Sequence, residues 1–305
     1  MILFTEQIDT WEDWGNVFQS IPAFTPLIEH IFKKENLPMS AIENLTPGTN
    51  AVFKVGDYVV KIFAPTGLGE DFGTEIDVEL FGMKWAQKQH VPAPRLIAEG
   101  IIIDKYDFQY IIMDHIPGKL LSEVENDLSD EDKIIIGQKV RKITDSLTQS
   151  CENFTSVDLK EYALNNNGWH AKGFPESFQA ERLTYLNHFP INANEKVYCH
   201  GDLHVENILI DDHLDVYIID FGDGMYAPAE YEETYIITGL FNFNKSYMTG
   251  YYGHYEVDDI VNLCLKWLPI HAWGHSFIEG SLQPVAEIVS FDILRQKLYD
   301  LIDSE

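Results

Sequence analysis

The pattern of apolar and polar positions predicts a short helical region followed by a small sheet. Apolar residues recur at helical spacing over 11–18 and 27–32, and the second stretch ends before Pro38. Two β-rich runs then fall within 51–63, separated by Gly56-Asp57, a dipeptide typical of a type I′ hairpin turn. A helix is predicted over 74–89, and two further strands over 96–103 and 108–113. Residues up to 113 therefore predict an antiparallel sheet with one helix.

Beyond Pro117-Gly118 the pattern changes to helical periodicity. Helices are predicted over 130–147 and 178–189, interrupted later by one short hairpin with strands over 207–210 and 215–220. After this hairpin the chain returns to helical patterns rich in aromatic residues. We therefore predict an α+β protein with an N-terminal lobe over 1–115 and a larger, mainly helical lobe over 116–305.

The net charge of the chain limits the kinds of molecule that it is expected to bind. The 305-residue chain is 45% apolar and 23% charged, which is ordinary globular usage, but its formal net charge is −28. Residues 1–115 hold 8 basic and 17 acidic side chains, and residues 116–305 hold 13 and 32. Such a chain repels nucleic acid and anionic membranes and attracts small cations.

Cysteine usage and hydropathy bear on the compartment. The three cysteines form no C-x-x-C pair, and three in so long a chain cannot make a disulfide framework. The first residues lack a basic region followed by an apolar stretch, and no run reaches the roughly 18 apolar residues of a membrane span. We expect a cytoplasmic protein with no obligate protein partner.

The strongest chemical signal lies in the predicted hairpin of the second lobe. Residues 200–207 are HGDLHVEN, and residues 218–222 are IIDFG. A tight hairpin brings the start of one strand beside the end of the other, so Asn207 and Asp220 are expected to face one another. Paired oxygen ligands suit Mg²⁺, and Asp202, five residues before Asn207, is placed to act as a base in phosphoryl transfer.

A second, weaker signal lies in the first lobe. Residues 45–53 are LTPGTNAVF, and a glycine at a hairpin tip lets backbone amides approach phosphates closely. Lys61, on an apolar strand, is the natural cation for those phosphates. Glu75 and Glu79 stand one helical turn apart, so either could hold Lys61.

These motifs resemble the aminoglycoside phosphotransferase and choline kinase-like family, a branch of the protein-kinase-like fold. The pattern H-G-D-x-H-x-x-N followed by I-D-W/F matches at His200, Gly201, Asp202, His204, Asn207, Ile219, Asp220 and Phe221. The pattern p-G-t-N-x-V followed by v-v-K matches at Pro47, Gly48, Asn50, Val52 and Lys61. Alignment on Pro92 and Pro94 places the family's helix glutamate at Glu79 rather than Glu75.

The resemblance implies a bilobal fold, ATP or GTP as donor, Mg²⁺, and transfer to a hydroxyl of a small molecule. Carried over by position, the catalytic base is Asp202 and the metal ligands are Asn207 and Asp220. The implied nucleotide-binding residues are Gly48, Thr49, Asn50, Lys61, Glu79, Met113 and His115, the last two on a hinge whose backbone would read the base. The chain departs from the family after Asp223, where Glu230 and Glu232 both could support the catalytic loop.

Other patterns leave alternatives open. His271 and His275 stand four apart, as in zinc-binding helices, but two buried histidines in an aromatic cluster fit the pattern better. The aromatic and acidic residues over 226–273 suit either a cationic acceptor, such as an aminoglycoside or a choline-like amine, or a packed core.

A nucleotide-binding pseudokinase is the alternative function. A kinase acting on proteins is less favoured, because His204 replaces a lysine and no A-P-E segment follows.

Overall fold

The chain folds into two compact units. The computed structural model describes residues 2–46, 48–65, 75–151, 158–189 and 196–304. The N-terminal unit comprises Met1–Lys88 and Ala93–Pro117, and the C-terminal unit comprises Gln89–Pro92 and Gly118–Glu305. The short segment Gln89–Pro92 thus belongs with the second unit, although the chain around it belongs with the first.

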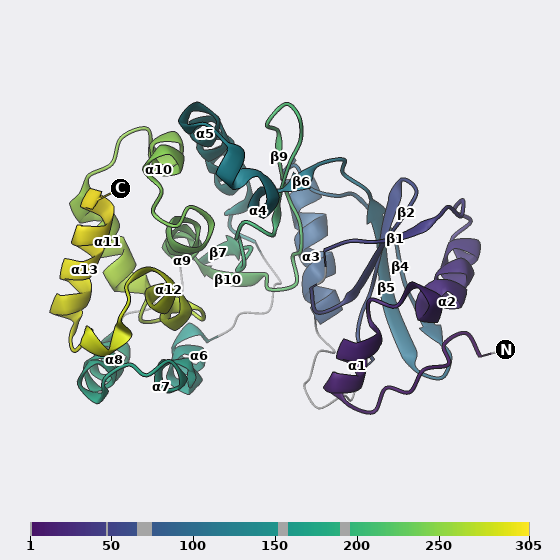
Figure 1. Ribbon diagram of the computed structural model, residues 1–305, viewed down its shortest axis with the longest axis horizontal. Coiled ribbons are helices and arrows are strands. Elements are labelled where there is room, and N and C mark those ends of the chain that lie inside the picture. Colours follow the sequence, from purple (N-terminus) through teal and green to yellow (C-terminus); the bar gives the residue numbers. More distant parts are fainter. Residues whose placement is uncertain (1, 47, 66–74, 152–157, 190–195, 305) are drawn as a thin grey trace. The chain divides into compact units, whose positions relative to one another are not determined.

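A five-stranded antiparallel sheet forms the centre of the N-terminal unit, with strand order β1-β2-β3-β5-β4. Helix α3 lies on one face of this sheet and α2 on the other (Figure 1). The strands are β1 (Ile42–Asn44), β2 (Ala51–Val55), β3 (Tyr58–Ile62), β4 (Leu96–Ile103) and β5 (Asp107–Asp114). The helices are α1 (Trp11–Val17), α2 (Ile21–Lys34) and α3 (Glu75–Lys88).

The β2–β3 hairpin sets the alternation that positions Lys61. Val55 pairs with Tyr58, so the turn has two residues, as predicted. Only its first residue has a positive φ (Gly56, 62°), whereas a type I′ turn requires two, so the prediction of that turn type was wrong. Along β3, Val60 and Ile62 contribute to the core beneath α2. Because side chains alternate across a strand, Lys61 points to the opposite face, where α3 lies.

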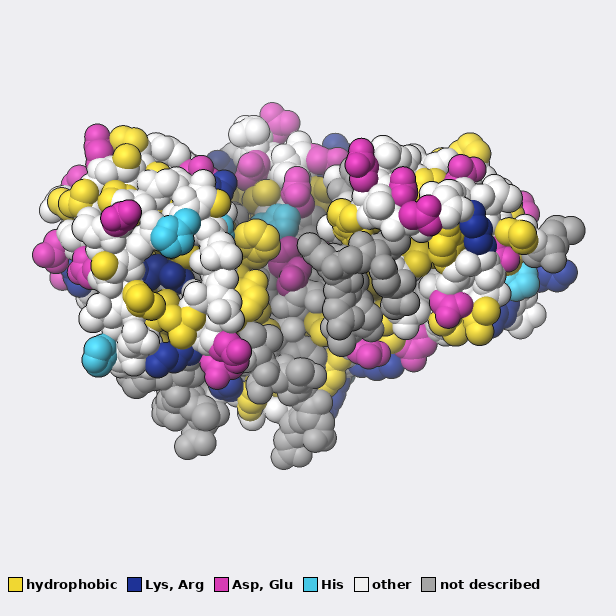
Figure 2. Space-filling model, turned by 90° about the horizontal axis from the view of Figure 1, so that it is seen from below, with side chains coloured by type: hydrophobic (Ala, Val, Ile, Leu, Met, Phe, Trp, Pro, Cys, Tyr) yellow, Lys and Arg dark blue, Asp and Glu magenta, His cyan; other side chains and the backbone are white. Residues whose placement is uncertain are grey.

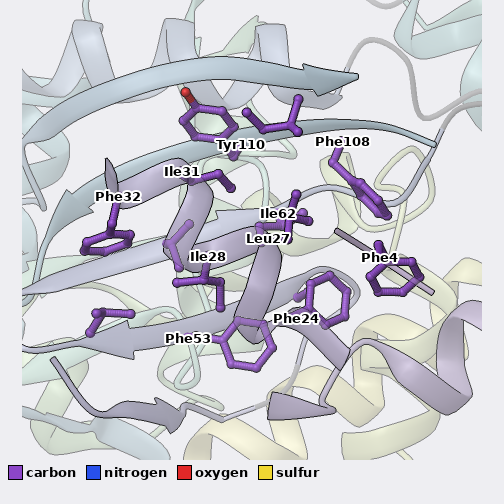
Figure 3. Close-up of a cluster of buried hydrophobic side chains, with 14 of the residues drawn as sticks. Phe4, Phe24, Leu27, Ile28, Ile31, Phe32, Phe53, Ile62, Phe108 and Tyr110 are labelled. Carbon is purple, nitrogen blue, oxygen red and sulfur yellow. The ribbon is translucent and has the colours of Figure 1, made fainter. Parts of the chain in front are cut away.

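The core of this unit lies between α1, α2 and the sheet. Apolar residues of α2 recur at helical spacing and are fully buried (Figure 3), and the ring of Phe24 packs on those of Phe53 and Phe108. The members from α2 are Phe24, Leu27, Ile28, Ile31 and Phe32. Burying each such side chain contributes about 1.5–3 kcal/mol, which is why α2 forms although Pro26 lies inside it.

The C-terminal unit is mainly helical. Its strands form a three-stranded sheet of order β6-β8-β9 and a two-stranded sheet of β10 and β7. These strands are β6 (Lys119–Leu120), β7 (Lys196–Cys199), β8 (Ile208–Ile210), β9 (Val216–Ile218) and β10 (Met225–Pro228). The first helices are α4 (Leu121–Val124), η2 (Glu125–Asp127), α5 (Asp130–Leu147), α6 (Leu159–Asn165), α7 (Gly168–Ala171) and α8 (Glu176–His188). The remaining helices are α9 (Ala229–Tyr235), η4 (Ile236–Leu240), α10 (Lys245–Tyr252), α11 (Val257–Trp267), α12 (Gly274–Ser281), η5 (Val285–Glu287) and α13 (Phe291–Ser304).

Element boundaries agree well with the sequence pattern where local signals are strong. Helix α5 has the predicted bounds because Ser129 caps it through a capping box with Asp132. Helix α3 begins at Glu75, and the predicted start at Thr74 lies outside the described residues.

The surface carries the acidic excess of the composition. Acidic side chains are spread over the face shown in Figure 2. Among the helices of the described residues, none combines the length and apolar character needed to cross a membrane.

Candidate active site

In the N-terminal unit, the lysine and glutamate predicted at the nucleotide phosphates form a buried ion pair. Lys61 Nζ on β3 lies 2.7 Å from Glu79 Oε2 on α3, and both side chains are buried. The distance corresponds to a charge-assisted hydrogen bond. Glu75, the other candidate, instead accepts a hydrogen bond from Asn50 Nδ2 at 2.6 Å. Glu79 therefore fixes the lysine ammonium, and Glu75 fixes the loop before β2.

That loop is held from two sides. Asn50 is buried, and its Oδ1 accepts from the Ala64 backbone N–H at 3.4 Å, so its side chain joins the loop to the end of β3. The indole Nε1 of Trp14 on α1 donates to the Thr49 carbonyl at 2.8 Å. Gly48 is exposed, and a Cβ built on it meets nothing within 4 Å. The loop is thus anchored at Thr49 and Asn50 and open at Gly48, while Pro47 lies outside the described residues.

The predicted hinge uses its backbone groups within the sheet. Met113 pairs with Val59 on one side and with Leu96 on the other. The His115 N–H donates to the Asp57 carbonyl at 2.9 Å. That donor is therefore engaged by the β2–β3 turn.

In the C-terminal unit, the carboxylate of Asp202 is the centre of a hydrogen-bond network. The Tyr235 hydroxyl donates to its Oδ1 at 2.5 Å, and Asn207 Nδ2 donates to its Oδ2 at 3.1 Å. His204 Nε2 lies 3.3 Å from the same Oδ2. Burial opposes ionisation, but the hydrogen bonds from His204 and Tyr235 hold the pKa of Asp202 below its ordinary value. Asp202 is therefore a carboxylate, as a proton acceptor must be.

His204 has a defined tautomer in its neutral form. The Glu206 N–H donates to His204 Nδ1 at 3.2 Å, so the ring proton sits on Nε2, which faces Asp202. Burial lowers the pKa of His204, but the neighbouring Asp202 more than offsets this and raises it. The ring therefore donates to Asp202 in either protonation state.

His200 connects the loop of Asp202 with the strand end that precedes Asp220. Its Nδ1 accepts from the Asp202 N–H at 3.4 Å, and its Nε2 lies 3.1 Å from the Ile219 carbonyl. The side chain is fully buried, and burial lowers its pKa, so the ring is neutral with its proton on Nε2. This histidine thus aligns the two segments that carry the predicted base and the predicted metal ligands.

The predicted metal ligands lie at adjacent positions of the β8–β9 hairpin. The Ile219 N–H donates to the Asn207 carbonyl at 3.0 Å, one step beyond the pair Ile208–Ile218. The amide nitrogen of Asn207 is used by Asp202, which leaves its Oδ1 as the side-chain acceptor. Asp220 is exposed and has a left-handed φ of 63°, a strained conformation that aspartate tolerates. Both side chains offer hard oxygen atoms, the donor type that Mg²⁺ takes from proteins.

Glu232 on α9 is the acid that supports the HGD loop. Its Oε2 accepts from the Gly201 N–H at 3.0 Å, and the residue is 1% exposed. Its Oε1 has no hydrogen-bond partner among the described residues. Burial raises the pKa of Glu232 to about 7. Glu230, the alternative left open by the sequence, instead accepts hydrogen bonds from Lys266 and Trp267.

Gly201 is required by this close packing. It has a φ of 84°, and a Cβ there would lie 2.2 Å from the Asp223 carbonyl oxygen. The glycine of the HGD motif thus lets the loop pass between Asp223 and Glu232.

The sequence did not reveal the role of Tyr235, which was grouped with the aromatic residues of a possible cation site. Tyr235 is 4% exposed, and its ring packs on His271 and Phe277. Burial and the neighbouring Asp202 raise its pKa far above 10, so the phenol remains a donor. No signal in the sequence separates this tyrosine from the others, because its function depends on a contact 33 residues away.

The two histidines and most of the aromatic cluster form core rather than an open site. His271 precedes α12, stacks on Tyr231 at 4.1 Å, and is fully buried, which lowers its pKa to about 3. Tyr231, Tyr251 and Trp267 are also buried. Among the described residues no group of three or more His, Cys, Asp or Glu side chains is arranged to hold a metal. The packed-core interpretation is therefore the one that fits these residues.

A separate pocket of about 380 Å³ lies in the C-terminal unit between α5 and β9. Its lining includes Lys139, Lys142 and Tyr217, and none of the predicted site residues. Lys139 Nζ is already engaged by Asp215 and by the Leu214 carbonyl, both at 2.7 Å.

The sheet unit with a Lys–Glu pair and the helical unit with an HGD loop define a kinase-like phosphotransferase fold. Comparison with known proteins agrees: residues 45–259 match the model of the phosphotransferase enzyme family, and the chain belongs to that family. No curated protein sequence matches the chain significantly.

Solved structures of aminoglycoside phosphotransferases share this fold. The GDP complex of aminoglycoside 2'-phosphotransferase-IIIa aligns with a TM-score of 0.62 at 16% identity, over 92% of this chain and 99% of that one. The streptomycin–ATP ternary complex of APH(2")-IIa aligns with 0.59 at 16% identity, over 88% and 96%. Spectinomycin phosphotransferase with ADP and spectinomycin aligns with 0.51 at 14% identity, over 90% and 98%.

Proposed function

We propose that this protein transfers the γ-phosphate of ATP or GTP to a hydroxyl of a small, cationic acceptor. The observation that carries the proposal is the carboxylate of Asp202, which is partly exposed, ionised and oriented by three side-chain donors. It stands on the loop where resemblance to the family implies the catalytic base. Membership in the phosphotransferase family supports the reaction class.

In the proposed reaction, Asp202 accepts the proton of the acceptor hydroxyl as its oxygen attacks the γ-phosphorus. The bond from that phosphorus to the bridging oxygen breaks, and the nucleoside diphosphate leaves. Lys61, held by Glu79, would contact the phosphates of the nucleotide. Catalysis of this kind rests on positioning and electrostatics and requires no covalent intermediate on the protein.

Asn207 Oδ1 and the Asp220 carboxylate would hold Mg²⁺, which offsets phosphate charge when bound. The donor set fits this ion, because both atoms are hard oxygens and Mg²⁺ usually takes only one or two side-chain ligands from a protein. The loop at Gly48, Thr49 and Asn50 would approach the phosphates through its backbone.

A cationic acceptor is supported by the charge of the chain. A formal charge of −28 attracts amines and repels polyanions. Two of the solved relatives were captured with streptomycin and with spectinomycin, respectively. We extend the proposal to amino sugars and amino alcohols as the acceptor class, and to the cytoplasm as the compartment.

The experiment is a transfer assay with wild-type protein and Asp202→Asn. Nucleotide consumption and the ³¹P NMR spectrum of the product are followed with water alone and with a panel of amino sugars and amino alcohols. We expect a phosphate monoester on one class of acceptor, and turnover about 10²–10⁴-fold lower in Asp202→Asn. Full activity of the variant would remove Asp202 from its assigned role.

The same assay separates the alternatives. Phosphate found on a polypeptide rather than on a metabolite would indicate a protein kinase. Nucleotide binding without turnover, even into water, would indicate a pseudokinase.

A further inference from the structure

The hydrogen bonds to Asp202 are distributed unequally between its two oxygens. Oδ2 receives Asn207 Nδ2 at 3.1 Å and faces His204 Nε2 at 3.3 Å. Oδ1 receives only the Tyr235 hydroxyl, at 2.5 Å. A carboxylate oxygen offers two lone pairs, so among the described contacts Oδ2 is fully used and Oδ1 keeps one lone pair open.

Tyr235 itself is fixed by packing. Its ring lies 5.1 Å from the ring of His271 and 4.9 Å from that of Phe277, and the side chain is almost fully buried at the end of α9. Three residues earlier on α9, Glu232 holds the Gly201 N–H, so one helix fixes both the backbone of the catalytic loop and the carboxylate it carries. The phenol therefore stands on a rigid element, as a group that orients a reacting atom requires.

From this arrangement we infer that Tyr235 is a positioning residue that presents Oδ1 of Asp202 to the acceptor hydroxyl, which must approach on the Tyr235 side of the carboxylate. The inference rests on the proposed function and names the atom that takes the proton. In the transfer step the acceptor O–H bond breaks, its oxygen bonds to the γ-phosphorus as the nucleoside diphosphate leaves, and the proton passes to Oδ1. The phenol keeps its own proton throughout.

Tyr235→Phe tests this inference, because it removes only the hydroxyl and keeps the ring in its packing. Tyr247→Phe is the matched control: Tyr247 is also a buried tyrosine of this unit, and its hydroxyl has no hydrogen-bond partner among the described residues. Turnover is expressed per nucleotide-binding site counted by calorimetry, so that a partly unfolded preparation does not mimic a slower enzyme.

We expect Tyr235→Phe to lower kcat about 10- to 100-fold, the effect of losing one hydrogen bond to a charged group. The KM values for nucleotide and acceptor should stay within about twofold of wild type, since the inference assigns the hydroxyl to Asp202 and not to binding either substrate. Tyr247→Phe should match wild type in all three constants. Where no acceptor is known, slow nucleotide hydrolysis, with water in place of the hydroxyl, gives the same comparison.

Two results would overturn the inference, and they are distinguishable. Wild-type turnover in Tyr235→Phe, with wild-type nucleotide binding, would contradict the role of Tyr235 and leave the proposed function standing. Absence of nucleotide binding in the wild-type protein would refute the proposed function and this assignment with it.

Discussion

Glu232 combines complete burial with a partly satisfied carboxyl group. Its Oε2 accepts from Gly201, whereas its Oε1 has no partner among the described residues. Ionising such a group costs free energy, because water is excluded and one oxygen is uncompensated. Glu232 thus fixes the HGD loop at a cost in stability that depends on pH.

The pKa of Glu232, raised by burial to about 7 from 4.5, predicts the sign of that dependence. Between these values the unfolded chain releases a proton that the folded chain retains, so this residue's contribution to stability falls as pH rises. The free energy of unfolding of wild type relative to Glu232→Gln should therefore fall by about 2 to 3 kcal/mol between pH 5 and pH 8. Urea unfolding at both pH values measures it.

Wild type and Glu232→Gln are compared in the same buffers at both pH values, so that the other titrating groups contribute equally to the two proteins and cancel from the difference. If the free energy of unfolding of wild type relative to Glu232→Gln were the same at pH 5 and pH 8, the Glu232 carboxyl would not titrate in this range in the folded protein.

At the scale of elements, the loop before β2 depends on the helices that precede it. The indole of Trp14 is nearly completely buried, stacks on Phe18, and donates to the Thr49 carbonyl. The family match begins at residue 45, so this anchor comes from a segment outside it. Helix α1 therefore restrains Thr49 and leaves Gly48 as the open point of the loop.

Gly48→Ala should show whether the loop before β2 binds phosphate or only connects to the β2–β3 hairpin. A Cβ there meets no atom within 4 Å, so the variant should unfold at the wild-type temperature. If backbone amides approach phosphates at this point, the added methyl group should raise the nucleotide Kd at least about tenfold. Calorimetric titration and thermal unfolding measure the two quantities.

Gly15→Ala on α1 is the comparison, since a Cβ there also meets nothing within 4 Å. It should leave the Kd unchanged and should not lower the unfolding temperature, because alanine is favoured over glycine inside a helix by about 0.5–1 kcal/mol. Nucleotide affinity in Gly48→Ala equal to that of wild type would mean that no phosphate comes close to Gly48.

Most helices and strands were predictable from local signals in the sequence, whereas the contacts between them were not. Capping at Ser129, alternation along β3 and the two-residue turn after Val55 are encoded within a few residues. The turn type was missed because it depends on the φ of one residue, Asp57. The hydrogen bond from the His115 N–H to this turn joins positions 58 residues apart and likewise has no local signal.

The same distinction holds for the site. The HGD loop is a motif of fixed spacing. Spacing alone left Glu75 and Glu79 open as partners of Lys61, and the resemblance to the family selected Glu79, which the structure pairs with Lys61. The tyrosine on Asp202 and the choice of Glu232 over Glu230 depend on how α9 packs against the loop, which no spacing specifies. The aromatic cluster was ambiguous for the same reason, because burial, not composition, decides between core and cation site.

At the scale of the whole molecule, the residues that we propose for phosphoryl transfer are divided between the two units. Lys61 and Glu79 belong to the first unit, and Asp202, Asn207 and Asp220 to the second. Asp212 provides a matched control for a metal-ligand variant, because it is an exposed carboxylate on the same hairpin as Asp220.

The most direct test is calorimetric titration of ATP and GTP, with and without Mg²⁺, into wild type, Asp220→Ala and Asp212→Ala. It requires no knowledge of the acceptor. We expect binding in the micromolar range that needs Mg²⁺, is lost in Asp220→Ala and is retained in Asp212→Ala. No binding of either nucleotide to the wild-type protein, or binding indifferent to both Mg²⁺ and Asp220, would contradict the proposed function.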